Sequence, residues 1–227
     1  MLKYLINLLF PKLCLGCNSL LLHNETIICS ECNHNLPYTK HHFLERNDTT
    51  IKFYGIVPIE FSASMLYFHH KGIVQNLIHN LKYKNHQEIG TLLGKRYAKD
   101  LEAVNQIKTI TEIIPVPLHK KRLEERGYNQ VITFCEALSE ELKIPLNDSL
   151  LYRSRYSKTQ TKKDKESRKD VSNALFDINF TEADSNKHFL LIDDVLTSGA
   201  TLEACAKALL KIPNSKVSII TIAYTLS

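Results

Sequence analysis

One short stretch, residues 189–202, constrains the fold of this chain more than any other. It begins with four apolar residues (189–192), which predict a strand buried on both faces of a parallel sheet. Two adjacent acids follow, Asp193 and Asp194, and then a turn rich in hydroxyl groups. From Thr201 onward apolar residues recur at helical spacing. The sequence therefore predicts an α/β fold in which a parallel sheet is flanked by helices.

The turn after the two acids has groups that suit a phosphate monoester. A turn that leads into a helix offers free backbone N–H groups, to which the helix dipole adds partial positive charge. Hydroxyl groups can donate further hydrogen bonds, and a glycine lets the backbone approach an anion closely. The residues that supply these groups are Thr197, Ser198, Gly199, Ala200 and Thr201.

The two acids extend this phosphate site toward a sugar. They lie at the carboxyl end of the predicted strand, where ligands of open α/β sheets bind. Because carboxylates accept hydrogen bonds, Asp193 and Asp194 suit the vicinal hydroxyls of a ribose that carries a 5′-phosphate. The alternative is an ordinary strand and capped turn whose acids are merely solvated.

The whole stretch resembles the signature of the type I phosphoribosyltransferases, in which a strand, two acids and a hydroxyl-glycine-threonine turn follow one another. The resemblance implies that the ligand is phosphoribosyl pyrophosphate (PRPP), bound with Mg²⁺. It also implies that Asp193 and Asp194 are the catalytic acids at the ribose hydroxyls, and that residues 197–201 hold the 5′-phosphate.

Four cysteines near the N-terminus predict a metal site. Cys14, Cys17, Cys29 and Cys32 form two C-x₂-C knuckles, a spacing typical of four thiolates around Zn²⁺. The alternative, a pair of disulfides, requires an oxidising compartment, which nothing in the sequence indicates. Because protein ligands fill all four positions, we expect the zinc to be structural. The other two cysteines, Cys135 and Cys205, fall on apolar stripes of predicted helices and are expected in the core.

Nothing in the composition indicates a membrane protein. Hydrophobic residues make up 44% of the 227-residue chain, and no apolar run is long enough to span a bilayer. Residues 1–10 are apolar but few, are interrupted by polar residues and lack a small-residue cleavage site. We interpret them as a short amphipathic helix and not as a signal peptide. We therefore expect a cytoplasmic protein without a membrane span.

The polar, aperiodic residues 34–50 predict a linker between two domains, a zinc ribbon with its linker (1–48) and a phosphoribosyltransferase-like domain (49–227). Short strands are predicted at 54–59 and 64–68. Two helices are predicted next, at 73–81 and 87–104. Lys82 and Lys84 lie between these helices, either as surface lysines or facing the phosphates of a ligand.

Two cationic segments could bind anions. A basic loop is predicted after a strand at 113–116, and its side chains suit pyrophosphate. We predict that Lys120 and Arg126 are the residues of this loop that bind it. A solvated basic turn is the alternative. Residues 153–170 contain eight Lys or Arg and three acids, an excess equal to the net charge of +5 of the whole chain. They predict either a lid over the site or a surface for single-stranded nucleic acid, unless they form an unstructured linker. The residues predicted to act in this lid or nucleic-acid surface are Gln160, Lys162, Lys163 and Arg168.

The order of the motifs along the chain resembles the ComF family of competence-associated, phosphoribosyltransferase-like proteins. The resemblance rests on the cysteine knuckles, Lys82, the run Arg126-Gly-Tyr-Asn-Gln130 and the acid pair with its turn. Ser198 stands where a second Thr is usual, and Tyr128 where Phe is usual. The family implies a role in DNA uptake during natural transformation, with other competence proteins as partners.

Two hypotheses of function follow. In the first, the protein binds PRPP with Mg²⁺ and transfers the phosphoribosyl group to a nitrogen acceptor. No residue stands out as a general base, so positioning and electrostatics would supply the rate. In the second, the protein is a non-catalytic module that binds single-stranded DNA, and its PRPP pocket is regulatory or vestigial.

Overall fold

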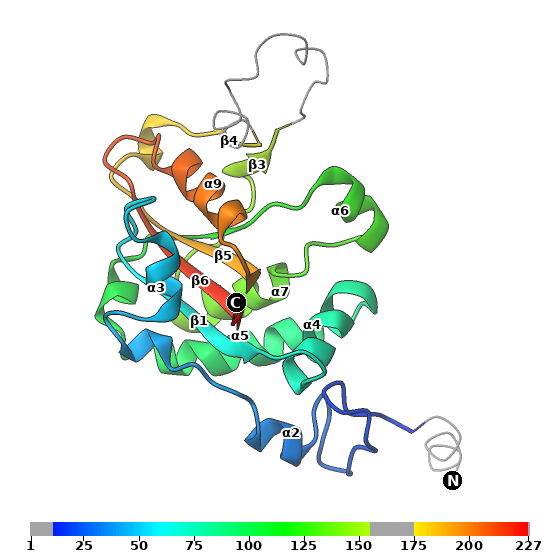
Figure 1. Ribbon diagram of the computed structural model, residues 1–227. Coiled ribbons are helices and arrows are strands. Elements are labelled where there is room, and N and C mark those ends of the chain that lie inside the picture. The colour runs from blue at the N-terminus through cyan, green and yellow to red at the C-terminus, as the bar shows by residue number, and fades with distance from the viewer. Residues whose placement is uncertain (1–10, 155–174, 227) are drawn as a thin grey trace.

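The computed structural model describes residues 11–154 and 175–226 (Figure 1). Within them a four-stranded sheet has the order β1-β6-β5-β2, and each neighbouring pair is parallel. The two central strands carry long apolar runs, as expected of strands that are covered on both faces. The strands are β1 (Ser62–Phe68), β2 (Glu112–Pro115), β5 (His188–Leu196) and β6 (Lys216–Thr225).

Helices cover both faces of this sheet, as Figure 1 shows. Alternate residues of β5 point to opposite faces, so Leu190 and Ile192 join one apolar cluster while Phe189 and Leu191 join the other. All four side chains are fully buried. The first cluster contains residues of α4 (Ile73–Tyr83), α5 (Glu88–Leu101) and α7 (Ile132–Leu142), and the second contains residues of α3 (Asp48–Phe53) and α9 (Ala200–Leu209).

The cysteine-rich segment, residues 11–34, packs on α4. It contains the short helix α2 (Ser30–His34) and one isolated antiparallel bridge, between Leu13 and Leu20. The side-chain amides of two α4 residues, Asn76 and Asn80, donate to backbone carbonyls of the segment at 2.7 and 2.9 Å. Buried cysteines of the segment share one apolar cluster with α4. The segment is therefore attached to the sheet domain by both polar and apolar contacts.

Residues 34–60 differ from the prediction. The expected linker contains the 3₁₀ helix η1 (His41–Phe43) and the start of α3, which Asn47 caps by accepting from the N–H of Thr50 at 2.9 Å. The strand predicted at 54–59 is wrong, because a turn follows α3 there. Phe53 and Val57 are buried against the sheet at the spacing of one helical turn, which explains the apolar residues of this stretch. The proposed boundary between residues 48 and 49 falls in the first turn of α3 and remains a prediction.

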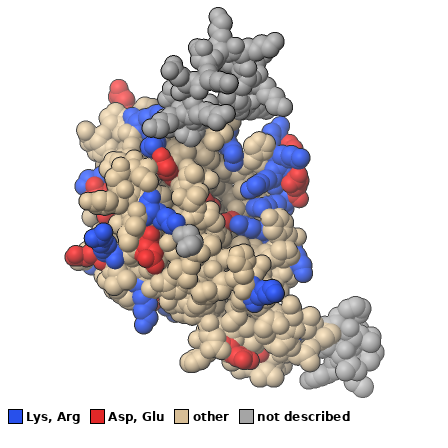
Figure 2. All heavy atoms as spheres, in the orientation of Figure 1, with Lys and Arg blue, Asp and Glu red and all other residues tan. Residues whose placement is uncertain are grey.

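The basic stretch after β2, predicted as a loop, contains helix α6 (Lys120–Arg126). Ion pairs one turn apart support it, Lys120 with Glu124 at 3.6 Å and Lys121 with Glu125 at 3.9 Å. None of its residues is buried, so it lacks the apolar period by which helices are predicted. In Figure 2, Lys and Arg side chains gather on the side of the molecule where Figure 1 places α6 and the end of α4.

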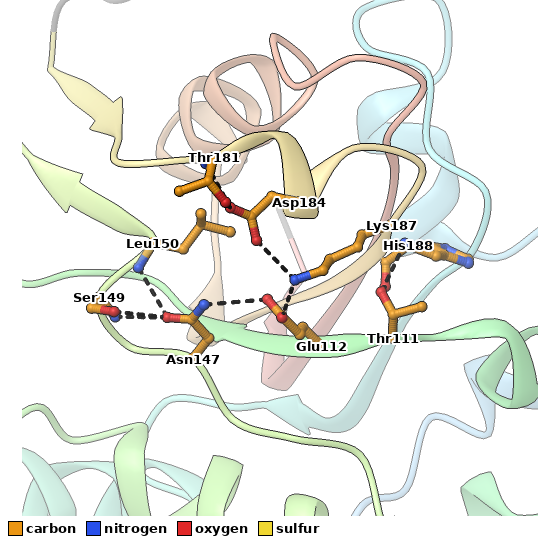
Figure 3. Close-up of polar contacts among 9 residues, drawn as sticks. All are labelled: Thr111, Glu112, Asn147, Ser149, Leu150, Thr181, Asp184, Lys187 and His188. Atoms are coloured by element: carbon orange, nitrogen blue, oxygen red, sulfur yellow. Dashed lines mark hydrogen bonds and ion pairs between the residues drawn. The ribbon is translucent and has the colours of Figure 1, made fainter.

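Polar contacts around Lys187, here called the clasp, connect the segment before β5 to the start of β2 (Figure 3). The ammonium of Lys187 contacts Glu112 at 2.5 Å and Asp184 at 2.8 Å. Glu112 also accepts from the amide of Asn147, whose own oxygen accepts from backbone N–H groups of the following turn. The clasp thus holds the connection before β5 and the turn before β3 (Leu151–Arg153) against β2. Strand β3 pairs antiparallel with β4 (Phe176–Ile178), and neither strand was predicted.

In the two described ranges, no helix combines the length and the apolar character needed to cross a bilayer.

Candidate functional site

The acid pair lies within the last part of β5. The predicted strand ended before the acids. In the structure β5 continues to Leu196, because its parallel pairing with β6 extends to Tyr224. Asp194 is buried and Asp193 is half-buried. Because successive side chains of a strand point to opposite faces, the two acids have different neighbours. Asp193 lines a hollow beside the hydroxyl-rich turn, whereas Asp194 faces α4 and the segment before α7.

Asp194 is held by two side chains from other elements. The ammonium of Lys82, in the last turn of α4, lies 2.8 Å from its Oδ1. The amide of Gln130 donates to its Oδ2 at 2.5 Å. A cation and a hydrogen-bond donor at separate oxygens fix the carboxylate in position. Asp194 is therefore a well-oriented hydrogen-bond acceptor at the carboxyl end of the sheet.

Gln130 is in turn positioned by Arg126. The Arg126 guanidinium donates to Gln130 Oε1 at 2.6 Å, and it lies 4.9 Å from the centre of the Tyr83 ring. Asn129 donates to the carbonyl of Val116 at 3.0 Å, which ties this segment to the end of β2. A chain of contacts thus connects Tyr83 through Arg126 and Gln130 to Asp194. Arg126 is thus connected to Asp194 through one intervening side chain, and its role in ligand binding remains a prediction.

Asp193 has a different electrostatic setting. Burial, together with the negative charge of Asp194, raises the pKa of Asp193 to about 7, although the charge of Lys82 opposes the shift. Its Oδ1 accepts from the backbone N–H of Asp194 at 2.8 Å. Near neutral pH this carboxyl group can therefore either accept a hydrogen bond or donate one.

The predicted phosphate turn forms a small hollow between β5 and α9. Its lining runs from Val195 to Leu202 and includes Asp193. Gly199 has a φ of +85°, in the left-handed region, and α9 begins at the next residue, Ala200. Three hydroxyl residues, Thr197, Ser198 and Thr201, are exposed around it. The first turn of a helix and these hydroxyls give the hollow the donors that an anion requires.

A basic groove of about 280 Å³ adjoins Asp194 on the other side. Lys82, the partner of Asp194, is part of its wall. The remaining lining residues come from the connection between α4 and α5 and from α6 and its C-terminal end, and they are Tyr83, Lys84, Asn85, Arg122, Glu125, Arg126 and Tyr128. The predicted residue Lys120 is not among them, because its side chain lies on the exposed side of α6 with Glu124. Arg122 and Arg126 are the α6 cations that face the groove.

The four predicted lid or nucleic-acid residues, Gln160, Lys162, Lys163 and Arg168, lie outside the described residues. The neighbouring residue Arg153 is described, and its guanidinium lies 5.3 Å from the centre of the Phe176 ring, where β3 pairs with β4.

The four cysteine sulfurs are placed to bind one metal ion. All lie within 4.8 Å of one another, and the sulfurs of Cys17 and Cys29 are 3.7 Å apart. Tetrahedral zinc with bonds of about 2.3 Å requires sulfurs about 3.8 Å apart. Backbone N–H groups donate to Cys14 Sγ from Gly16 and Cys29, as expected around a thiolate. Hydrogen bonds from Ser19 lower the pKa of Cys17 to about 6, which also favours the metal-binding form. The donor set and the spacing fit zinc.

Sequence reasoning did not choose Lys82 or Gln130 as site residues. Lys82 ends an amphipathic helix, and a lysine there is by default exposed. Its position directly after the buried stripe of α4 was the available signal. Gln130 stood in the quoted Arg126–Gln130 run, but nothing in the sequence indicated that its amide reaches an acid 64 residues away.

The family model of the phosphoribosyl transferase domain matches residues 130–227, which include the acid pair and the turn. Competence protein F of Haemophilus influenzae is 32% identical over 152 residues, which cover 63% of this chain and 64% of that protein. Competence protein ComFC of Bacillus subtilis is 28% identical over 139 residues, with 61% of this chain and 54% of that protein covered. The chain thus spans less than two thirds of the length of either relative.

Among solved structures, the glutamine PRPP amidotransferase from Bacillus subtilis, complexed with ADP and GMP, superposes on 63% of this chain and on 30% of its own. The TM-score is 0.43 and the identity 14%. The fold class does not depend on that superposition. It follows from the helix-covered parallel sheet, the strand-turn-helix around the acids and the family match, which together confirm the prediction of a phosphoribosyltransferase-type domain.

Proposed function

Because this chain belongs to the ComF family of phosphoribosyltransferase-like proteins, we propose that it binds PRPP with Mg²⁺ at the acid pair and turn described above. The observation that carries the proposal is the hollow lined by Asp193 and by helix-terminal donors, together with the oriented carboxylate of the next residue, Asp194, which faces Lys82 and Gln130. A ribose hydroxyl pair and a 5′-phosphate need these two kinds of group at neighbouring places.

Each part of the site has a separate task in this proposal. The turn from Thr197 to Thr201 binds the 5′-phosphate, and Asp193 and Asp194 orient the ribose through its hydroxyls. The cations of the groove, Arg126 among them, balance the charge of pyrophosphate. Mg²⁺ would neutralise part of that charge when it is bound with PRPP.

If the protein is an enzyme, a nitrogen nucleophile attacks C1 of the ribose. The new C1–N bond forms as the C1–O bond to pyrophosphate breaks, the electron pair leaves with pyrophosphate, and the nitrogen releases its proton to solvent. The contribution of this chain is to hold the sugar and to stabilise the leaving group. The zinc site supports the segment that packs on α4 and takes no part in the chemistry, because all four metal positions have cysteine ligands.

Calorimetry with PRPP and with ribose 5-phosphate, each with and without Mg²⁺, tests the binding. Thr201→Ala should weaken both ligands by about 1.5–3 kcal/mol, the worth of a hydrogen bond to a charged group. Thr26→Ala is the matched control, since Thr26 is exposed in the cysteine-rich segment. If the wild-type protein binds neither ligand, the proposal fails. Release of pyrophosphate in the presence of candidate nitrogen acceptors then decides whether the bound PRPP is turned over.

A second function, binding of single-stranded DNA without catalysis, is favoured by the basic groove and by the names of the relatives. One further relative, 28% identical over 155 residues that cover 66% of each chain, is the DNA utilization protein YhgH of Escherichia coli. Under this alternative the protein works in the cytoplasm with other competence proteins, and its PRPP pocket is regulatory or vestigial. DNA affinity without any PRPP turnover would favour it over the enzyme.

A further inference from the structure

Lys82 lies at the junction between the acid pair and the basic groove. Its ammonium is 2.8 Å from Asp194 Oδ1, and the same side chain forms part of the groove wall. The side chain of Lys82 is 20% exposed and that of Asp194 is 7% exposed. An ion pair this far from solvent has a fixed geometry, unlike the exposed pairs of α6.

The backbone around Lys82 is also fixed. The phenol of Tyr128 donates to the carbonyl of Leu81, so the last turn of α4 is tied to the segment that carries Gln130. Asp194 therefore contacts two side chains, Lys82 and Gln130, whose backbones are themselves joined. Lys84, two residues further on, lines the groove as well, but it is exposed, and among the described residues no ion pair joins it to Asp194.

We propose that Lys82 is a positioning residue of the PRPP site, which acts on the ribose through Asp194 and not by direct contact with pyrophosphate. The inference rests on the proposed function. Its geometric ground is that Lys82 binds one oxygen of Asp194 while Gln130 binds the other, so the carboxylate is fixed in one orientation and keeps lone pairs for the ribose hydroxyls. Removing the ammonium would leave a buried carboxylate held at one oxygen only, next to a second carboxyl group.

A direct role on pyrophosphate predicts a different behaviour. A lysine that contacts pyrophosphate contributes to PRPP binding but not to the binding of ribose 5-phosphate, which has no pyrophosphate. A lysine that orients Asp194 contributes to both ligands equally, because both present the same ribose hydroxyls. The two roles are therefore separated by comparing the two ligands.

The test is a binding cycle measured by calorimetry on the full chain. The variants are Lys82→Met, which keeps the aliphatic stem, Asp194→Asn, and the double variant. We expect Lys82→Met to lower the affinity for ribose 5-phosphate and for PRPP by the same factor, about tenfold. Losses of this size are typical of residues that orient a ligand-binding group. The double variant should bind no more weakly than Asp194→Asn alone, because the two residues act as a unit. Lys82→Arg should recover most of the affinity, and Lys99→Met, an exposed lysine of α5 outside the hollow and the groove, is the control with wild-type affinity for both ligands.

Each outcome decides the question. A loss confined to PRPP, or effects of Lys82→Met and Asp194→Asn that add, would overturn the positioning role. An unchanged affinity of Lys82→Met for both ligands would overturn it as well. Thermal melting of each variant distinguishes a lost fold from a lost contact, and the rescue by Lys82→Arg is not expected if Lys82 only fills space. A wild-type protein that binds neither ligand would remove the proposed function, and with it this inference.

Discussion

The Arg126 guanidinium lies over the Tyr83 ring, 4.9 Å from its centre, although the two residues come from different helices. The same guanidinium donates to Gln130 at 2.6 Å, so the aromatic ring sets the orientation of a group that reaches the acid pair. A planar cation can stack on a ring and donate hydrogen bonds in its plane at once, which an ammonium cannot do.

Arg126→Lys should therefore lower the affinity for PRPP by about tenfold even though the charge is kept, because a lysine cannot both stack on Tyr83 and donate to Gln130. Calorimetry measures the change. Tyr83→Phe keeps the ring and loses only the exposed 3.4 Å hydrogen bond from Arg126 to the phenol, so it should bind PRPP nearly as the wild type does. Equal affinities of Arg126→Lys and the wild type would show that only the charge of this residue matters.

Gly199→Ala should destabilise the fold as well as the site. The turn is exposed at its hydroxyls, but Gly199 itself is buried, with a φ of +85° and the Phe53 ring 3.4 Å from where a Cβ would lie. A side chain in the left-handed region costs about 1–2 kcal/mol, to be measured by urea denaturation. Gly127→Ala is the control, since Gly127 has a φ of +77° but open space around it. Since the Phe53 ring lies at about van der Waals distance, the two glycine variants should lose similar stability, and an unchanged stability of Gly199→Ala would contradict the prediction.

Lys187→Met should lower the free energy of unfolding by about 1–3 kcal/mol at neutral pH, because it leaves Glu112 and Asp184 facing each other at the clasp. Lys207→Met, which removes a pair with Glu203 on the surface of α9, should cost less than about 1 kcal/mol.

The effect of Lys187→Met should also depend on pH. Hydrogen bonding to Lys187 lowers the pKa of Asp184, so this stabilisation is present above the ordinary value of 3.8 and is lost as the pH falls through the folded pKa. Hydrogen bonding to Asp184 raises the pKa of Lys187, so its share is present below 10.5 and is lost as the pH rises through the folded pKa. Denaturation between these limits should show the largest difference from the wild type. A difference that stays constant at acid pH would contradict the clasp.

Protein purified without a chelator should contain one zinc ion per chain by elemental analysis. Cys14→Ser should reduce the zinc content and the thermal stability together, because Cys14 is buried in the cluster that includes α4. Cys205→Ala is the control, a buried cysteine outside the metal cluster, and should keep full zinc content. Zinc-free protein with unchanged stability would contradict a structural metal.

Lys162, Lys163 and Lys165 are the basis of a prediction that rests on sequence alone. If this segment binds single-stranded DNA, reversing all three to Glu should reduce the slope of log affinity against log salt by about 0.7 for each lost phosphate contact. Reversal of Lys99, Lys108 and Lys211, exposed elsewhere on the chain, is the matched control. An unchanged slope would place the DNA contact outside this segment, and the groove beside Tyr83 would be the next surface to test.

The sequence predicted the parallel sheet and the placement of the acid pair beside the hydroxyl turn, because a buried strand, its polar end and the next helix are all local patterns. It failed for α6, whose stability comes from ion pairs on an exposed helix and not from an apolar stripe. It failed for α3 because this helix has only six residues, too few to show a helical period, and the apolar residues that follow it resemble a strand. Lys82 and Gln130 could not be assigned, since their role depends on Asp194, which reaches them only after the sheet is assembled.

The contacts of Lys187 also help to set the register between β2 and β5, and with it the position of the acid pair. Lys187 is held to Glu112, and the paired residues of β2 and β5 then run in register from Glu112 and Phe189 to Pro115 and Ile192, directly before the acids. A slip of one residue would turn every side chain of β5 to the other face, so one acid would take the place of the other and an apolar neighbour would take the place left over. Insertions and deletions should therefore be tolerated among relatives in the connection before Asp184, but the interval from Lys187 to Asp194 should have a fixed length.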